Sequence, residues 1–368
     1  MITVNSIERK SNQLLQCLQS VAVARFVLCL AIFFAVPGKG TAVTLESGDI
    51  VVVDSSAAVL RVEPETGSQT VISSGGNLVR PFGVVIDAKG DAIVTDTGAQ
   101  AVIRIDPQTG SNTVVSSGGI LGAPYGIALD DQGNILVANG QAIIRVDPVT
   151  GAQTAVSSNG LFRAPVGVAV GPDGTIFVAD LTGAILRVDP NSGEQLSVNA
   201  GSNLVNPVGI AIDDSGKLLV ADECSHTLVR IDATTGTQEM VSGGGDLVTP
   251  VSVAVSAHHD ILVGDPDAFN LNGGVIQIDP ASETQTNVYV GSGEMVNPRG
   301  VAIVPSIRDR IARLCPCNGP TPSRPWRNHR EYVRAVAKVA RQFVRAGSIT
   351  NDEKLAIVSG ARTSDCGR

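Results

Sequence analysis

The chain has 368 residues, of which 40 are glycine and only 3% are aromatic. Its apolar share of 43% comes mostly from Val, Ile, Leu and Ala, a mixture typical of many short strands joined by tight turns. Residues 43–305 carry ten basic and twenty-nine acidic side chains. The resulting net charge of −19 repels phosphate backbones and argues against nucleic acid as a partner.

The first 42 residues have the organisation of an export signal. Basic residues up to Arg25 precede an apolar run over residues 26–36, and residues 40–42 are small enough for cleavage. Eleven apolar residues are too few to cross a bilayer, which needs about 20. The alternative, an uncleaved anchor helix, would have to bury Arg25. We expect a signal peptide at residues 1–42, a secreted bacterial protein (extracellular or periplasmic), and no stable membrane insertion after cleavage.

Residues 43–305 form a repeat with a period near 43. A Pro-x-Gly frame recurs five times and a Pro-x-Ser variant once, beginning at Pro81, Pro124, Pro165, Pro207, Pro250 (the Ser variant) and Pro298. Each unit continues with an alternating strand, a DxxG-type turn, an IxVAD strand, an IxRVD strand, a PxTG turn and a polar strand. Four alternating strands in 40–45 residues are typical of a propeller blade. The apolar spacing of two excludes long helices here.

The number of blades follows from the turn after the third strand. It occurs six times, at Glu63, Asp106, Asp147, Asp189, Asp232 and Asp279. The first unit lacks its own first strand, and residues 298–304 supply that strand and nothing else. Pairing the two ends would complete the sixth sheet and remove its open edges. The sequence therefore predicts an all-β fold, a six-bladed β-propeller of four-stranded antiparallel blades with non-covalent closure, over residues 43–305.

The PxG(I/V)AV and (I/V)xVAD segments resemble the NHL repeats of six-bladed propellers, over roughly residues 44–305. Streptogramin lyases and regucalcin-like gluconolactonases share that general architecture. The resemblance implies the fold. Because one propeller scaffold carries binding proteins, lyases and hydrolases alike, function has to be argued from the site.

One face of the predicted ring varies from unit to unit. The turns after the first and third strands repeat closely, whereas the links into each first strand and the loops after each second strand differ. The middle residue of the Pro-x-Gly frame is in turn Phe82, Tyr125, Val166, Val208, Val251 and Arg299. We interpret Phe82, Tyr125 and Arg299 as a candidate ligand site at a channel mouth, with Glu223 and His226 from a nearby loop. Drift at tolerant loop positions is the alternative.

Two features could hold a cation. The second strand of every unit ends in an acid or amide: Asp54, Asp96, Asn139, Asp180, Asp222 and Asp265. A residue present in every unit is expected to accept backbone N–H groups rather than a metal ion. The loop after the second strand of the sixth unit is longer than its counterparts and offers a candidate calcium site, with a Gly/Asn-rich turn as the alternative: Asp265, Asp267, Asn270 and Asn272.

Catalytic patterns are sparse. Residues 223–226, Glu-Cys-Ser-His, form a mixed cluster that is a weak zinc signal. His258 and His259 fall in a turn on the opposite face from His226, so the three cannot form one site. We assign no catalytic residue and no cofactor other than the candidate calcium ion. We expect a binding or scaffold module that takes a protein, a glycan or a small molecule on its variable face; the alternative is a metal-assisted lyase or lactone hydrolase.

Residues 306–368 break the repeat and carry a net charge of +8. Apolar residues at helical spacing predict a helix over residues 331–345, and Thr350 with Glu353 forms a capping box for a second helix ending at Gly360. The CPC, PWRNHREYV and SDCG segments resemble a small cysteine-bearing module of secreted bacterial proteins. We expect a helical hairpin docked on the acidic body, with binding to a membrane surface as the alternative.

Signal cleavage would leave four cysteines, Cys224, Cys315, Cys317 and Cys366, which allow three pairings. We expect Cys366 to bond one cysteine of the Cys315-Pro316-Cys317 motif and so to staple the hairpin. The other cysteine of that motif would then reach Cys224 or stay free.

Overall fold

The computed structural model of the protein describes residues 42–198, 204–256, 259–290, 297–319, 324–345 and 348–367. The predicted signal peptide, apart from its last residue, lies outside the described residues, as does His258. Within the described ranges, no helix is both long and apolar enough to cross a membrane.

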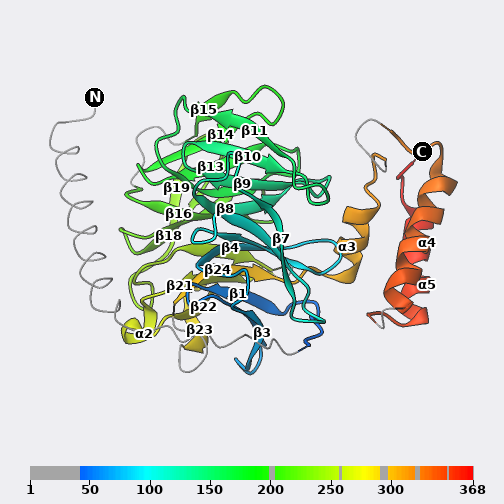
Figure 1. Ribbon diagram of the computed structural model, residues 1–368, viewed down its shortest axis with the longest axis horizontal. Helices are drawn as coiled ribbons and strands as arrows, with labels where there is room; N and C mark the ends of the chain where they lie inside the picture. The colour runs from blue at the N-terminus through cyan, green and yellow to red at the C-terminus, as the bar shows by residue number, and fades with distance from the viewer. Residues whose placement is uncertain are drawn as a thin grey trace.

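Six four-stranded antiparallel sheets are arranged around a central axis as the blades of a propeller (Figure 1). The first strand of each sheet contacts the first strands of both neighbouring sheets, so these six strands line the axis. From the axis outward, three blades are β24 (Pro298–Ile303), β1 (Ile50–Asp54), β2 (Ala58–Val62), β3 (Gln69–Ser74); β4 (Pro81–Ile86), β5 (Ala92–Asp96), β6 (Ala101–Ile105), β7 (Asn112–Ser117); and β8 (Pro124–Leu129), β9 (Ile135–Asn139), β10 (Ala142–Val146), β11 (Gln153–Ser158). The other three are β12 (Pro165–Val170), β13 (Ile176–Asp180), β14 (Ala184–Val188), β15 (Gln195–Ser197); β16 (Pro207–Ile212), β17 (Leu218–Asp222), β18 (Thr227–Ile231), β19 (Gln238–Gly243); and β20 (Ser252–Val255), β21 (Ile261–Asp265), β22 (Gly274–Ile278), β23 (Gln285–Val290). The predicted six-bladed propeller is confirmed.

The core lies between the blades. The second strand of every blade is buried at each position, because the blade is sandwiched between two neighbours. These strands accordingly read as nearly continuous apolar runs, such as IVVVD in β1 and ILVAN in β9. The outermost strands are exposed on alternate or successive positions and are polar, as β7 and β11 show. Hydrophobic burial between faces therefore holds neighbouring blades together.

Ring closure occurs as predicted. Strand β24 pairs antiparallel with β1, and Val301 lies opposite Val52. The backbone N–H of Val304 donates to the carbonyl of Asp49 at 2.8 Å, which extends the pairing past the strand end. The last strand of the repeat thus becomes the innermost strand of the first blade.

Removing the closing strand should unfold the ring. A chain ending at residue 297 loses the buried side chains of Val301 and Val304, which together stabilise the fold by about 3–6 kcal/mol, and it exposes the edge of β1. We expect it to aggregate or to melt far below a chain ending at Pro305, which keeps β24 and also lacks the tail. Equal melting temperatures for the two chains, measured by circular dichroism, would contradict closure by β24.

The glycine of the Pro-x-Gly frame is required by close approach of neighbouring inner strands. A Cβ on Gly300 would lie 2.6 Å from the carbonyl oxygen of Phe82 in the next blade. The exception, Ser252, lies opposite Gly264, whose own Cβ would fall 2.5 Å from the Ser252 hydroxyl. Other second strands have Val, Thr or Ala at that position. In this blade the glycine is therefore on the second strand and the larger residue on the first strand, the reverse of the arrangement in the other five blades.

In four blades the arginine of the third strand pairs with a carboxylate located between the first and second strands: Arg61, Arg104, Arg145 and Arg230. Arg104 donates to Asp87 at 2.6 Å and to Asp91 at 2.8 Å. In the blade where glutamine replaces arginine, Gln277 donates to Asp260 at 2.8 Å. These contacts stabilise the face that contains the turns after the first strands. The loops that differ between blades lie on the opposite face.

The tail contains three helices beside the propeller: α3 (Ile307–Leu314), α4 (His329–Arg345) and α5 (Asn351–Thr363) (Figure 1). The capping box of Thr350 and Glu353 is present. Helix α5 runs through Gly360 to Thr363, past its predicted end, and buries Ala361 in the tail core. Helix α3 was not predicted from the sequence, although its N-cap residue, Ser306, accepts the N–H of Asp309 at 3.1 Å.

Cys366 is bonded to Cys317, and this disulfide joins the end of the tail to the segment before α4. Cys315 is a free thiol, 2% exposed, and burial raises its pKa to about 11. Its place in the apolar tail core leaves it protonated and unreactive at neutral pH. Cys224 is disulfide-bonded, but not to Cys315.

Arg310 fastens the tail to the acidic propeller. Its side chain, 6% exposed for the whole residue, donates to the carbonyls of Ala88 (3.2 Å) and Lys89 in the turn after β4. Its guanidinium also lies 4.9 Å from the centre of the Phe343 ring in α4. Burial lowers the pKa of Arg310, while the carboxylate of Asp87 acts in the opposite direction. Helix α3 therefore makes the hydrogen bonds between the tail and the propeller, whereas the sequence predicted that the helical hairpin would dock there.

Substituting Arg310 with alanine should detach the tail. The change strands two carbonyls and removes the cation–π contact, at a cost of about 1–3 kcal/mol. We expect limited proteolysis between residues 306 and 324 to accelerate by about tenfold or more. Arg308→Ala is the control, because Arg308 is exposed on the same helix. Equal cleavage rates for the two variants would show that other contacts hold the tail.

Candidate functional site

The mouth of the channel is formed by the residue after the proline of each inner strand. Around the axis these strands follow the order β24, β4, β8, β12, β16, β20. Arg299, Phe82 and Tyr125 therefore lie on three consecutive strands. The rings of Phe82 and Tyr125 meet edge to face, with centroids 5.3 Å apart and planes at 86°. Half of the mouth thus combines a cation with an aromatic pair.

The other half of the mouth is aliphatic. Val166, Val208 and Val251 are 3–5% exposed and pack with one another against the aromatic pair. Leu181, which directly follows β13, adds to this cluster from the rim. The backbone around the mouth repeats six times, but the side chains do not. One half of the mouth has a cation and two aromatic rings, and the other half is aliphatic.

A small cavity lies below the mouth. It measures about 80 Å³ and is lined by residues of all six inner strands that follow the frame proline, Phe82 and Arg299 among them; on β8 the lining residues are Gly126 and Ile127. Ser252 also lines this cavity, but its hydroxyl lies beside Gly264 of β21; the hydroxyl is buried and has no hydrogen-bond partner among the described residues. Arg299 thus places a charged side chain on one side of a channel that is otherwise lined mainly by glycine and apolar residues.

Thr95 fixes the position of Tyr125. This buried threonine of β5 accepts the N–H of Gly83 at 3.0 Å and donates its hydroxyl proton to the carbonyl of Tyr125 in the next blade. Sequence reasoning missed it. The available signal was a threonine in the VTD segment of β5, where three other blades have alanine.

Glu223 and His226 lie in the loop after β17, farther from the axis than the mouth residues. The side-chain amide of Asn206 donates to Glu223 at 3.2 Å. His226 is exposed, has a left-handed backbone (φ 58°), and contacts the carbonyl of Val248 through its Nδ1. Glu223 is thus a rim residue, whereas His226 contacts the link into β20 of the next blade.

The acid or amide that ends each second strand fastens the link between blades. Asp96 accepts the backbone N–H groups of Val79, Arg80, Gly98 and Ala99 at 2.7–2.9 Å. In the closing blade Asp54 accepts the N–H of Asn297 at 2.6 Å. These side chains are nearly inaccessible to solvent. The carboxylates of this ring thus accept backbone N–H groups, as expected for a structural role.

The long loop of the sixth blade contains α2 (Ala268–Leu271), a single irregular turn with left-handed Phe269 and Asn270. Asp265 is buried and accepts the N–H groups of Val248 and Thr249, as its counterparts do. Asp267 accepts the Thr249 hydroxyl at 2.8 Å, and the Asn272 amide donates to the Phe269 carbonyl. Burial raises the pKa of Asp265. Calcium binding by this loop stays a prediction, and it would have to compete with these bonds.

Metal-type side chains do not gather elsewhere in the described part of the chain: no group of three or more His, Cys, Asp or Glu residues there could hold an ion. The polar side chains singled out from the sequence are instead bonded to nearby backbone and amide groups.

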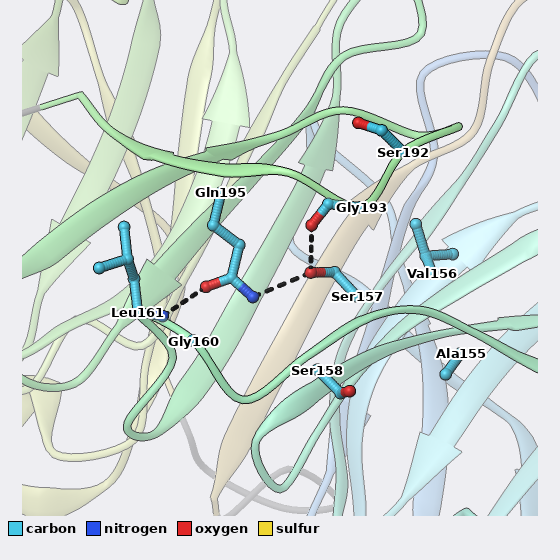
Figure 2. A pocket seen from close by; sticks show the side chains of 9 residues that line it. All are labelled: Ala155, Val156, Ser157, Ser158, Gly160, Leu161, Ser192, Gly193 and Gln195. Carbon is cyan, nitrogen blue, oxygen red and sulfur yellow. Dashed lines mark hydrogen bonds between the residues drawn. The ribbon is translucent and has the colours of Figure 1, made fainter.

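Larger grooves lie at the periphery, between neighbouring blades. Figure 2 shows one of about 520 Å³, where Gln195 donates to the Ser157 hydroxyl at 2.9 Å and accepts the Leu161 N–H at 2.6 Å. Ser157 in turn donates to the carbonyl of Gly193 at 2.6 Å. The same serine–glutamine pairing recurs between Ser116 and Gln153. Because its polar groups bond one another and the arrangement repeats, we interpret it as a structural joint.

The fold defines a six-bladed β-propeller. The model of the NHL repeat matches residues 204–231, which cover β16, β17 and β18. The predicted resemblance is thereby confirmed for fold and repeat.

Similar solved structures include proteins of different activity. One is described as the nidogen/laminin complex, with a TM-score of 0.61 and 19% identity, covering 70% of this chain and 98% of that one. Another is a streptogramin B lyase, with a TM-score of 0.55 and 18% identity over 73% of this chain and 89% of that one. A third is a catalytically inactive virginiamycin B lyase from Staphylococcus aureus with quinupristin (TM-score 0.52, 18% identity, 71% and 90% covered). No curated protein sequence matches the chain. At these identities the likeness shows the fold alone.

Replacing Asp96 with alanine should destabilise the propeller by at least about 3 kcal/mol, because each stranded buried N–H costs about 1–3 kcal/mol. Asp96→Asn should cost less, since Asn139 serves the same position in the next blade. Urea unfolding measures both effects. If calcium raised the stability of the unaltered protein but not of Asp96→Asn, the ring would be a cation site instead.

Proposed function

We propose that the protein is an extracellular recognition module that binds its ligand at the channel mouth, on the face formed by the links into the first strands and the loops after the second strands. The observation that carries this proposal is the two-sided mouth: Arg299, Phe82 and Tyr125 on one half, and aliphatic residues on the other. A ring with a purely structural role can have the same residue in every blade. Side chains that differ between blades make the mouth asymmetric, so that it can bind one ligand in one orientation.

The chemistry of the mouth indicates the kind of group it takes. An arginine forks onto a carboxylate or a hydroxyl-rich group, while the edge-to-face aromatic pair and the valines accept an apolar group. The cavity of about 80 Å³ has room for one such group and not for a whole drug-sized ligand. We expect the partner to insert a single carboxylate or small apolar group into the cavity and to rest the remainder on the rim.

Two observations support the extracellular setting and the binding role. The disulfide between Cys317 and Cys366 is typical of an oxidising compartment. A propeller with the same fold occurs in a structure of a nidogen/laminin complex, so this scaffold is compatible with binding a protein. The lyase alternative has only the fold in its favour, and one fold hosts many activities.

Phenylacetate is a suitable probe, since it joins an aromatic ring to a carboxylate. We expect Arg299→Ala to weaken its binding by about 1–3 kcal/mol, roughly 5- to 150-fold, through loss of a charged hydrogen bond, with little change in melting temperature. Arg163→Ala is the matched control, because Arg163 is exposed on the same face and donates to its own loop carbonyls. Titration calorimetry measures both.

Benzyl alcohol, which lacks the carboxylate, should bind weakly to all three proteins and should not distinguish Arg299→Ala from the unaltered chain. If Arg299→Ala and Arg163→Ala lost the same affinity for phenylacetate, or if Arg299→Ala lost only stability, the ligand site would lie away from the mouth.

A further inference from the structure

A row of cations runs along α4. Arginine or lysine recurs at intervals of four, four, three and four residues, which places the side chains on one stripe of the helix: Arg330, Arg334, Lys338, Arg341 and Arg345. With a rise of 1.5 Å per residue, the stripe is about 22 Å long. We call these five residues the α4 stripe.

The α4 stripe is open to solvent and uncompensated. All five residues are exposed, and none of them forms an ion pair with another described residue. The opposite side of the helix is occupied, because Val336, Ala340 and Phe343 are buried in the tail core. The stripe therefore faces outward, away from the packing that holds the hairpin.

This arrangement opposes the stability of the helix. Like charges four residues apart on a helix each cost about 0.2–0.5 kcal/mol, and the stripe has three such pairs. Arg330 also lies in the first turn, where the positive end of the helix dipole disfavours a cation. Repulsion within the row therefore does not help to hold α4 together.

The α4 stripe also does not dock the tail. The contacts with the propeller come from α3, where Arg310 donates to two carbonyls and Arg313 donates to the carbonyl of Ile86 at 3.4 Å. The cations of α4 are thus left for a partner outside this chain.

We propose that the α4 stripe binds a linear acidic polysaccharide. A single row of charges on a convex ridge fits one chain lying along it, and four of the five cations are arginines, which fork onto carboxylate or sulfate oxygens. Insertion into a membrane needs a free apolar face, which α4 has already buried. The propeller, with its net charge of −19, is repelled by a broad anionic surface or a duplex but not by a thin chain on the far ridge.

The test is titration of the full-length protein with polygalacturonate at low and physiological salt. We expect binding that weakens as salt rises, because exposed charges are screened within about 8 Å at 0.15 M. Arg334→Gln/Arg341→Gln should lose at least tenfold in affinity. Arg308→Gln/Arg362→Gln removes the same charge from exposed positions on α3 and α5 and should lose less than twofold.

Stability and a second site provide the remaining controls. The stripe variant should melt at the same temperature as the unaltered protein or higher, since like-charge repulsion is relieved, and Arg299→Ala should bind polygalacturonate normally. Absence of binding at low salt, equal loss in both double variants, or tighter binding to phosphatidylglycerol vesicles or single-stranded DNA than to polygalacturonate would each overturn the proposal.

Discussion

The close approach of the six inner strands around the axis is the constraint on which the rest of the structure depends. Where neighbouring backbones nearly touch, no ordinary side chain fits, and the third residue of the frame is glycine in five blades. The sixth blade keeps the spacing by pairing Ser252 with Gly264. With the backbone fixed in this way, the residue one step earlier is free to differ, and the differences among Phe82, Tyr125, Arg299 and the valines accumulate at the mouth.

The same constraint explains the fastening of the blades. Each link between blades has to return to the axis at a fixed height, and a buried acid or amide such as Asp96 or Asn139 holds it there through backbone N–H groups. On the opposite face, arginine–aspartate pairs such as Arg104 with Asp87 hold the turns. One face is therefore occupied by repeated structural bonds, and the other carries the variable residues.

The fold could be predicted from the sequence because its signals repeat. The Pro-x-Gly frame occurs with the period of a blade, and the missing first strand of one end is present at the other, which gave both blade number and closure. Contacts between different blades could not be predicted from the sequence. The Thr95 bond to Tyr125 depends on which strands become neighbours, and Gly264 has meaning only opposite Ser252. Helix α3 is short, and its role follows from Arg310 meeting a turn more than two hundred residues earlier.

The central claim is that a symmetric ring acquires one binding site where its inner side chains differ. Methyl NMR of the protein labelled at valine, leucine and isoleucine, titrated with phenylacetate, tests it most directly. The account predicts chemical-shift changes concentrated on the methyl groups of Val166, Val208, Val251 and Leu181, which surround the mouth, and on those that line the cavity below it, such as Ile127, Ile210 and Val301. Changes centred instead on Ile120 and Leu161 in the peripheral grooves, or on Ile86 and Leu129 at the other end of the inner strands, would contradict it.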